Sequence, residues 1–121
     1  MDDVREDAAE AMRRRLRERL QSALRARDAL TAAVMRTTIA AIDNAQAVAL
    51  AQPDARYQVR TFGEAGVEVP RRELAQADVD ALLAAEVAQR LETAHQFERH
   101  GQGAAAARLR DEASVLERYL K

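Results

Sequence analysis

The chain has 121 residues, is 48% hydrophobic and carries a net charge of −1 at pH 7. This length suits one domain with a modest core, and the charge argues against a nonspecific nucleic-acid binder. There is no cysteine, which excludes disulfides, thiolate catalysis and cysteine-ligated metals. No apolar run approaches the roughly 20 residues of a membrane span, and the acidic start lacks the apolar core of a signal peptide. We therefore expect a cytoplasmic protein with no membrane partner.

Charge is separated along the first 28 residues. Residues 1–11 carry five acids and one arginine, whereas residues 12–28 carry seven arginines and two acids. Acids followed by cations complement a helix dipole, so we predict one helix from about Asp3 to Arg27. Residues 1–11 lack large apolar side chains and are expected to be an exposed acidic extension of this helix, with the domain proper at 12–121. The buried stripe is expected to be Met12, Leu16, Leu20, Ala23 and Leu24.

A second helix is predicted to follow at once and to run to about Leu50. Asp28 suits its N-cap, because a short carboxylate can accept a hydrogen bond from an otherwise unpaired backbone amide. Its expected buried residues are Leu30, Val34, Met35, Ile39, Ile42 and Ala45. The helical period then breaks at Gln52-Pro53-Asp54, which predicts an inserted loop over residues 51–73. The alternative is a small β-hairpin turning at residues 63–66, although an isolated hairpin is marginally stable in water.

Two further helical segments meet at Gly101, where a helix end needs a residue that tolerates positive φ. The first starts near Gln76 and ends around His100, and the second starts near Gly103. Their apolar stripes are Val79, Leu82, Leu83, Val87, Leu91 and Ala94, then Leu109, Ala113, Leu116 and Leu120. The sequence thus predicts an all-α fold of four helices, arranged as two packed antiparallel helical hairpins with the long loop between the second and third helices.

The order and spacing of two patches resemble the YqeY family. The patches are Glu86-Val87-Ala88-Gln89-Arg90 with Phe97, Gly101, Glu112, Leu116 and Tyr119-Leu120, and Ala26-Arg27-Asp28 with Val34, Met35, Arg36, Ile42 and Asn44. The resemblance covers roughly Met12–Asn44 and Leu74–Leu120, which corresponds to the family's first domain. That family is similar to the tail of the B subunit of the glutamine-dependent aminoacyl-tRNA amidotransferase. The resemblance implies a helical module that engages tRNA, linked to carbon–nitrogen ligation with glutamine as the amido-nitrogen donor.

A pair of opposite charges lies on or beside the buried stripe of the third helix. Glu86 and Arg90 are spaced i,i+4, and partial burial would force them to pair because an unpaired charge is costly to desolvate. We expect a structural clamp between helices, with Glu112 or Arg36 as a further partner. The alternative is a carboxylate poised for acid–base chemistry, but no nucleophile or phosphate loop accompanies it.

Other reactive residues do not form a recognisable constellation. His95 and His100 lie about 140° apart around a helix, unlike an i,i+4 metal-binding pair. Ser22 and Ser114 have no neighbouring histidine or lysine, so a serine hydrolase arrangement is unsupported. We therefore expect no catalytic residue, no metal and no cofactor.

The leading hypothesis is a non-catalytic tRNA- or RNA-binding accessory module. Its candidate phosphate contacts are Arg13, Arg14, Arg17, Arg36, Arg71 and Arg72, and such contacts make binding salt-dependent. The plainer alternative for these arginines is a solvated helix face. A different class of function is a helical protein-interaction or self-association module, because large apolar residues are few and association could supplement a thin core. The expected partners are tRNA, a tRNA-handling protein or a second copy of the chain.

Overall fold

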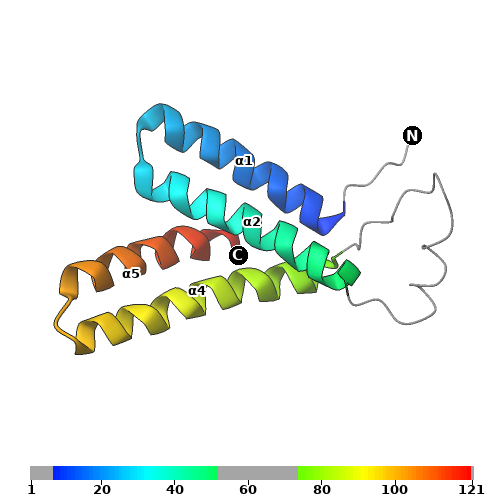
Figure 1. Ribbon diagram of the computed structural model, residues 1–121. Coiled ribbons are helices and arrows are strands. Elements are labelled where there is room, and N and C mark those ends of the chain that lie inside the picture. Colours follow the sequence, from blue (N-terminus) through cyan, green and yellow to red (C-terminus); the bar gives the residue numbers. More distant parts are fainter. Residues whose placement is uncertain (1–6, 52–73, 121) are drawn as a thin grey trace, which may run out of the picture.

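The computed structural model describes residues 7–51 and 74–120, with no side-chain description for residues 49–51. Labelled as in Figure 1, its elements are α1 (Ala8–Ala26), α2 (Ala29–Ala51), α4 (Gln76–Arg99), α5 (Gly103–Glu117) and the short 3-10 helix η1 (Arg118–Leu120). The described part of the chain is thus all-α with four α-helices, as predicted from the sequence. The choice between a loop and a β-hairpin concerns residues that lie outside this description. None of the described helices is both long and apolar enough to cross a bilayer.

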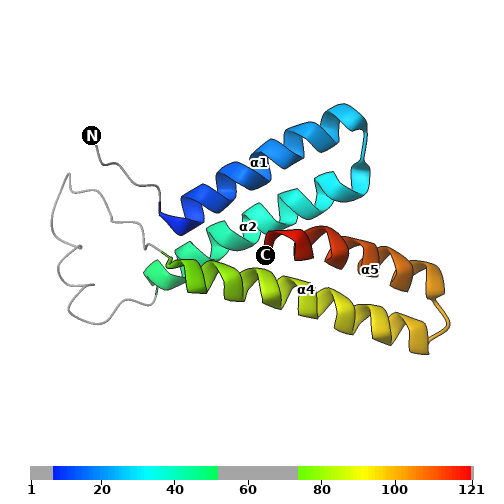
Figure 2. The same ribbon diagram turned by 180° about the vertical axis from the view of Figure 1, so that it is seen from behind.

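The four α-helices form two antiparallel hairpins that pack on one another, which confirms the predicted arrangement. α1 packs along α2, α5 packs along α4, and the second hairpin packs mainly against α2. Figures 1 and 2 show that the two hairpin tips lie at the same end of the molecule and diverge. At the opposite end, the last turns of α2 lie beside the first turns of α4. α2 therefore has neighbours on two sides, α1 on one and the second hairpin on the other.

The first helix begins later than its charge pattern suggested. The predicted start near Asp3 is wrong, because Asp7 has an extended backbone (φ −74°, ψ 170°) and acts as the N-cap. Its carboxylate accepts a hydrogen bond from the Glu10 N–H at 2.7 Å, which satisfies one of the unpaired amides of the first turn. The expectation that residues before Met12 are exposed is also wrong at Ala9, which is fully buried.

The tip of the first hairpin is closed by a residue in the left-handed conformation. Arg27 has φ 59° and ψ 36°, its N–H donates to the Leu24 carbonyl, and the Asp28 N–H donates to the Ala23 carbonyl at 2.8 Å. This pair of hydrogen bonds is the Schellman motif, which usually has glycine where this chain has Arg27. Asp28 then caps α2, because its carboxylate accepts from the Thr31 N–H at 3.0 Å and from the Thr31 hydroxyl at 2.7 Å.

The tip of the second hairpin follows the usual preference for glycine. Gly101 has φ 75°, as its position after the third apolar stripe predicted, and the Gln102 N–H donates to the Phe97 carbonyl at 2.8 Å. At the other end of α4, the Asp78 carboxylate accepts from the Ala75 N–H at 3.0 Å. Ala75 has no side-chain oxygen that could cap the first turn, so this bond from Asp78 is the side-chain contact that fixes the start of α4.

The core lies where α2 meets the other three helices. Its largest fully buried side chains include Leu16, Met35, Ile42, Leu83 and Leu116, and each contributes about 1.5–3 kcal/mol through removal of apolar surface from water. Thr38 is also fully buried, and its hydroxyl donates to the Val34 carbonyl at 2.7 Å. η1 packs against α4 and α5, and the Arg15 guanidinium of α1 lies 5.0 Å from the centre of the Tyr119 ring.

Three leucines that the sequence assigned to buried stripes are exposed instead: Leu24, Leu91 and, in η1, Leu120 at 36% exposure. Leu24 is 50% exposed near the tip of the first hairpin, and Leu91 is 41% exposed on α4. Leu24 lies on the last turn of α1, near the tip, where the two hairpins have diverged (Figure 1). Leu91 lies to the side of the core residues Leu83 and Val87, at the edge of the face that α4 turns to its neighbours.

Replacement of Arg27 by glycine is expected to stabilise the fold. A left-handed conformation is strained for arginine and unstrained for glycine, so Arg27→Gly should raise the free energy of unfolding by about 0.5–1 kcal/mol. Arg27→Ala is the matched control, because alanine keeps the strain and should give no gain. Urea denaturation followed by circular dichroism measures both, and equal stabilities of the two variants would contradict the assignment of strain to this residue.

Candidate functional site

Three arginines lie along one exposed face of α1. Arg14, Arg17 and Arg25 line a shallow depression of about 400 Å³, together with Glu18 and Gln21. These positions recur at three- and four-residue steps, which places them on one side of the helix. The name arginine face is used below for Arg14, Arg17 and Arg25.

Two exposed ion pairs lie on the arginine face. Arg14 lies 4.0 Å from Glu18 and Arg17 lies 3.9 Å from Glu10, and all four side chains are exposed. Exposed ion pairs of this length contribute about 0–1 kcal/mol. The face can therefore exchange these weak contacts for contacts with a polyanion.

Arg13 was predicted from the sequence to contact phosphate, but it does not belong to the arginine face. Its residue is only 4% exposed. Its Nε donates to Asp43 at 2.7 Å, its Nη1 donates to Glu10 at 2.7 Å, and its Nη2 donates to Gln46. Arg13 thus joins α1 to α2, and its side chain is not available to a phosphate. The sequence indicates this role, because Arg13 precedes the stripe residues Leu16 and Leu20 by three and seven residues and therefore lies on the same side of the helix.

The remaining arginine candidates are distributed differently. Arg36 is exposed on α2 and lines a separate depression at the tip of the first hairpin, together with Arg27. Arg71 and Arg72 lie outside the described residues. The sequence analysis did not include Arg27 among its candidates, and its exposure is visible only once the tip of the hairpin is folded.

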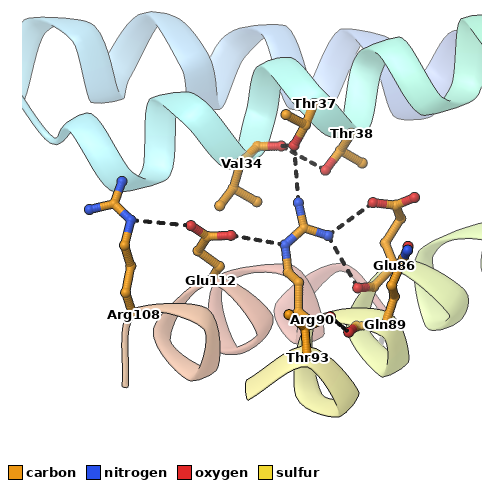
Figure 3. Close-up of polar contacts among 9 residues, drawn as sticks. All are labelled: Val34, Thr37, Thr38, Glu86, Gln89, Arg90, Thr93, Arg108 and Glu112. Atoms are coloured by element: carbon orange, nitrogen blue, oxygen red, sulfur yellow. Dashed lines mark hydrogen bonds and ion pairs between the residues drawn. The ribbon is translucent and has the colours of Figure 1, made fainter. Parts of the chain in front are cut away.

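The structure brings Glu86, Arg90 and Glu112 together between three helices (Figure 3). The Arg90 Nη1 lies 2.9 Å from the Glu86 carboxylate and also donates to the Glu86 backbone carbonyl at 3.1 Å. Its Nε donates to Glu112 on α5 at 3.1 Å, and its Nη2 donates to the Thr37 hydroxyl on α2 at 3.1 Å. Thr37, rather than Arg36, supplies the contact from α2. These four residues are called the clamp below.

Burial makes the clamp stronger than an ordinary surface ion pair. The side chains of Arg90, Glu112 and Glu86 are only 12%, 17% and 24% exposed. Charges in such a position must be paired, because an uncompensated charge loses its hydration without gaining a partner. Because each guanidinium nitrogen of Arg90 has an acceptor, the clamp is a closed polar network within the second hairpin that reaches α2 through Thr37.

The histidines do not contribute a site. His95 and His100 are both exposed, and the His100 Nδ1 lies 2.9 Å from the Gln96 backbone carbonyl. Among the residues that the structure describes, no group of three or more histidine, aspartate or glutamate side chains is placed to hold a metal ion.

Comparison with known proteins gives one match. A family model described as Yqey-like protein matches residues 13–121. No curated protein and no solved structure matches the chain. The matched region includes the arginine face, the clamp and both hairpins.

Loss of the clamp arginine is expected to destabilise the protein much more than loss of a neighbouring exposed arginine. Arg90→Met keeps most of the side-chain volume but leaves Glu86 and Glu112 without their cation, so unfolding should become easier by about 2 kcal/mol. Arg108→Met is the matched control. Arg108 is 60% exposed and lies 3.5 Å from Glu112, so its loss should cost less than about 0.5 kcal/mol.

Thermal and urea denaturation measure both changes. Glu112→Gln in the Arg90→Met background should recover part of the lost stability, because it removes one of the stranded charges. Equal losses in the two single variants would show that the clamp is an ordinary surface pair.

Proposed function

Because the chain belongs to the Yqey-like protein family, we propose that it is a non-catalytic accessory module that binds tRNA or another structured RNA. The observation that carries this proposal is the arginine face. Arg14 and Arg25 are separated by 11 positions along α1, which is about 16 Å at the rise of an α-helix. Guanidinium groups spread over this length can contact separate phosphates of one nucleic-acid backbone.

The surrounding chemistry favours backbone contacts over base readout. Aromatic residues make up only 3% of the sequence, whereas single-stranded RNA is usually read by bases stacked on aromatic side chains. Arginine contacts to phosphates position a protein on RNA without reading its sequence. The module therefore recognises RNA by shape and charge.

The proposal also assigns the acidic residues of the matched region to structure rather than catalysis. The half-buried carboxylates of Glu86 and Glu112 are both held by Arg90. Both carboxylates are thereby engaged in holding α4 and α5 together. With the resemblance to the tail of the amidotransferase B subunit, this favours an RNA-contacting domain that works beside a tRNA-handling enzyme.

Neutralisation of the arginine face is expected to remove RNA binding. The triple variant Arg14→Gln, Arg17→Gln, Arg25→Gln should bind tRNA at least tenfold more weakly at low salt than the unmodified chain. The slope of log K against log salt should also fall by about 2, since each lost phosphate contact removes about 0.7–0.9 from that slope. Electrophoretic retardation and fluorescence anisotropy over a salt series measure both quantities.

A triple variant with the same charge change controls for net charge. Arg99→Gln, Arg108→Gln, Arg118→Gln removes three exposed arginines from the second hairpin and η1, and it should bind nearly as well as the unmodified chain. No retardation of tRNA by the unmodified chain at low salt would rule out the proposal. Equal losses in the two triple variants would show that net charge alone drives binding.

A second candidate function, self-association, is favoured by an uncharged stripe on α4. Exposed small or apolar side chains recur there at alternating steps of four and three residues: Ala77, Ala81, Ala84, Ala88 and Leu91. Ala77, Ala81 and Ala88 lie on the side of α4 opposite its core residues, and Leu91 lies at the edge of the core face. Alternating steps of four and three residues are the heptad spacing of helices that pair in a coiled coil.

Charge in the middle of this stripe is expected to prevent any pairing through α4. Ala88→Glu with Leu91→Glu should sediment as a monomer of 13.4 kDa, whereas the unmodified chain should sediment at about twice that mass. Ala107→Glu, an exposed alanine on α5, is the control and should leave the mass of the unmodified chain unchanged. A monomeric unmodified chain at high concentration would rule out self-association as the function of this stripe.

A further inference from the structure

The tip of the first hairpin holds a depression that is separate from the arginine face. It has a volume of about 290 Å³ and lies between the last turn of α1 and the first two turns of α2. In Figure 1 this is the junction between the blue and cyan helices. The depression is called the tip pocket below.

The floor of the tip pocket is apolar and its rim is cationic. Ala23 and Ala32, which are almost fully buried, contribute small side chains to the floor. Leu24 stands at its side and is 50% exposed, which is the largest exposure among the large hydrophobic residues of the described chain. Arg27 and Arg36 complete the lining. A ligand that fits must offer both an apolar surface and negative charge.

The two arginines of the tip pocket are not neutralised by the protein. No carboxylate in residues 7–51 or 74–120 forms an ion pair with Arg27 or Arg36. Asp28, the acid of the pocket lining, is engaged by Thr31, whose N–H and hydroxyl both donate to its carboxylate. The hydrogen bond from the backbone N–H of Thr31 contributes most to lowering the pKa of Asp28 below its ordinary value of 3.8. Asp28 therefore stays anionic and its oxygens are engaged by Thr31, so Arg27 and Arg36 together leave the pocket lining with an excess of one positive charge for an external anion.

The position of the tip pocket relates it to the arginine face. Leu24 in the pocket is the immediate neighbour of Arg25, the last residue of that face. A polyanion that follows Arg14, Arg17 and Arg25 along α1 thus reaches the pocket at the end of the helix. An acidic peptide helix would also bring negative charge, but a depression of this size accepts one compact group rather than a row of side chains.

We propose that the tip pocket holds one unpaired nucleotide of the RNA. Its base lies against Leu24 and the alanine floor, and its phosphate lies between Arg27 and Arg36. A base stacked inside a helix cannot enter a depression of this kind, so the pocket selects RNA with single-stranded loops or bulges. This inference rests on the proposed RNA-binding function and adds which form of RNA the protein prefers.

Two RNAs with equal numbers of phosphates test the inference: a hairpin with an unpaired loop and a fully paired duplex. The complete chain should bind the hairpin about fivefold more tightly than the duplex, because burial of roughly 40 Å² of apolar base surface against Leu24 favours the complex by about that factor. Leu24→Ser should remove this preference and leave duplex affinity unchanged. Arg36→Gln should weaken hairpin binding more than duplex binding. Fluorescence anisotropy at fixed salt measures all affinities.

Val48→Ser is the matched control, because Val48 is 46% exposed near the opposite end of α2 and its loss should leave the preference intact. Circular dichroism of the variants verifies that each is folded. Equal affinity of the unmodified chain for the two RNAs, or an undiminished preference in Leu24→Ser, would overturn the nucleotide site and leave the arginine face as the RNA contact. Failure to bind either RNA at low salt would instead remove the proposed function and this inference with it. Binding of polyglutamate with the same dependence on Leu24 would assign the pocket to an acidic protein partner.

Discussion

The packing of the second hairpin depends on the guanidinium of Arg90. Its nitrogens bind Glu86 on its own helix α4, Glu112 on α5 and Thr37 on α2, whereas the apolar core is built from relatively few large side chains. Apolar packing is not directional, so a thin core with many alanines would tolerate sliding of one helix along another. A displacement of α5 along α4 by one helical turn, about 5.4 Å, would separate Arg90 from Glu112 and leave both charges partly buried without each other. The clamp thereby fixes the register of α4 and α5, and its hydrogen bond to Thr37 adds one directional contact with the first hairpin.

Arg13 performs a comparable task within the first hairpin. It joins α1 to α2 through Asp43 and Gln46, while its neighbour Arg14 is exposed on the arginine face. Two adjacent arginines therefore have unrelated roles, one inside the fold and one at its surface. The number of arginines in α1 is therefore larger than the number that can contact a phosphate backbone. Only the arginines that lie at the surface can take part in RNA binding.

The sequence predicted the elements well because helical periodicity is a local property. It placed all four helices, the cap at Asp28 and the positive φ of Gly101. The predictions were wrong where the burial of a side chain depends on a neighbouring helix, or where two sequence features favour different starts of a helix. Leu24 has the spacing of a core residue, but the second hairpin has diverged from α1 at the tip. Acidic residues near the chain start suggested an earlier helix, but the side chain of Asp7 caps it at Ala8.

The candidate site was predictable only in part. Arg90 and Glu86 were identifiable because their i,i+4 spacing falls beside an apolar stripe, and Glu112 was named as a partner from the sequence. The left-handed conformation of Arg27 was not predictable, because glycine usually occupies that position. The tip pocket was also not predictable from the sequence, since it is formed by residues from two helices that only the folded turn brings together.

The central place of α2 has a consequence for the order in which the protein is made. Contacts between α1 and α2 join neighbouring segments, so this hairpin can form while the ribosome is still synthesising α4 and α5. Until then, the side of α2 that carries Val34 and Thr38 has no covering helix, although both residues are almost fully buried in the finished fold. The nascent hairpin thus exposes an apolar strip to the cell during translation, and that interval is when the chain is most vulnerable to aggregation and most dependent on chaperones.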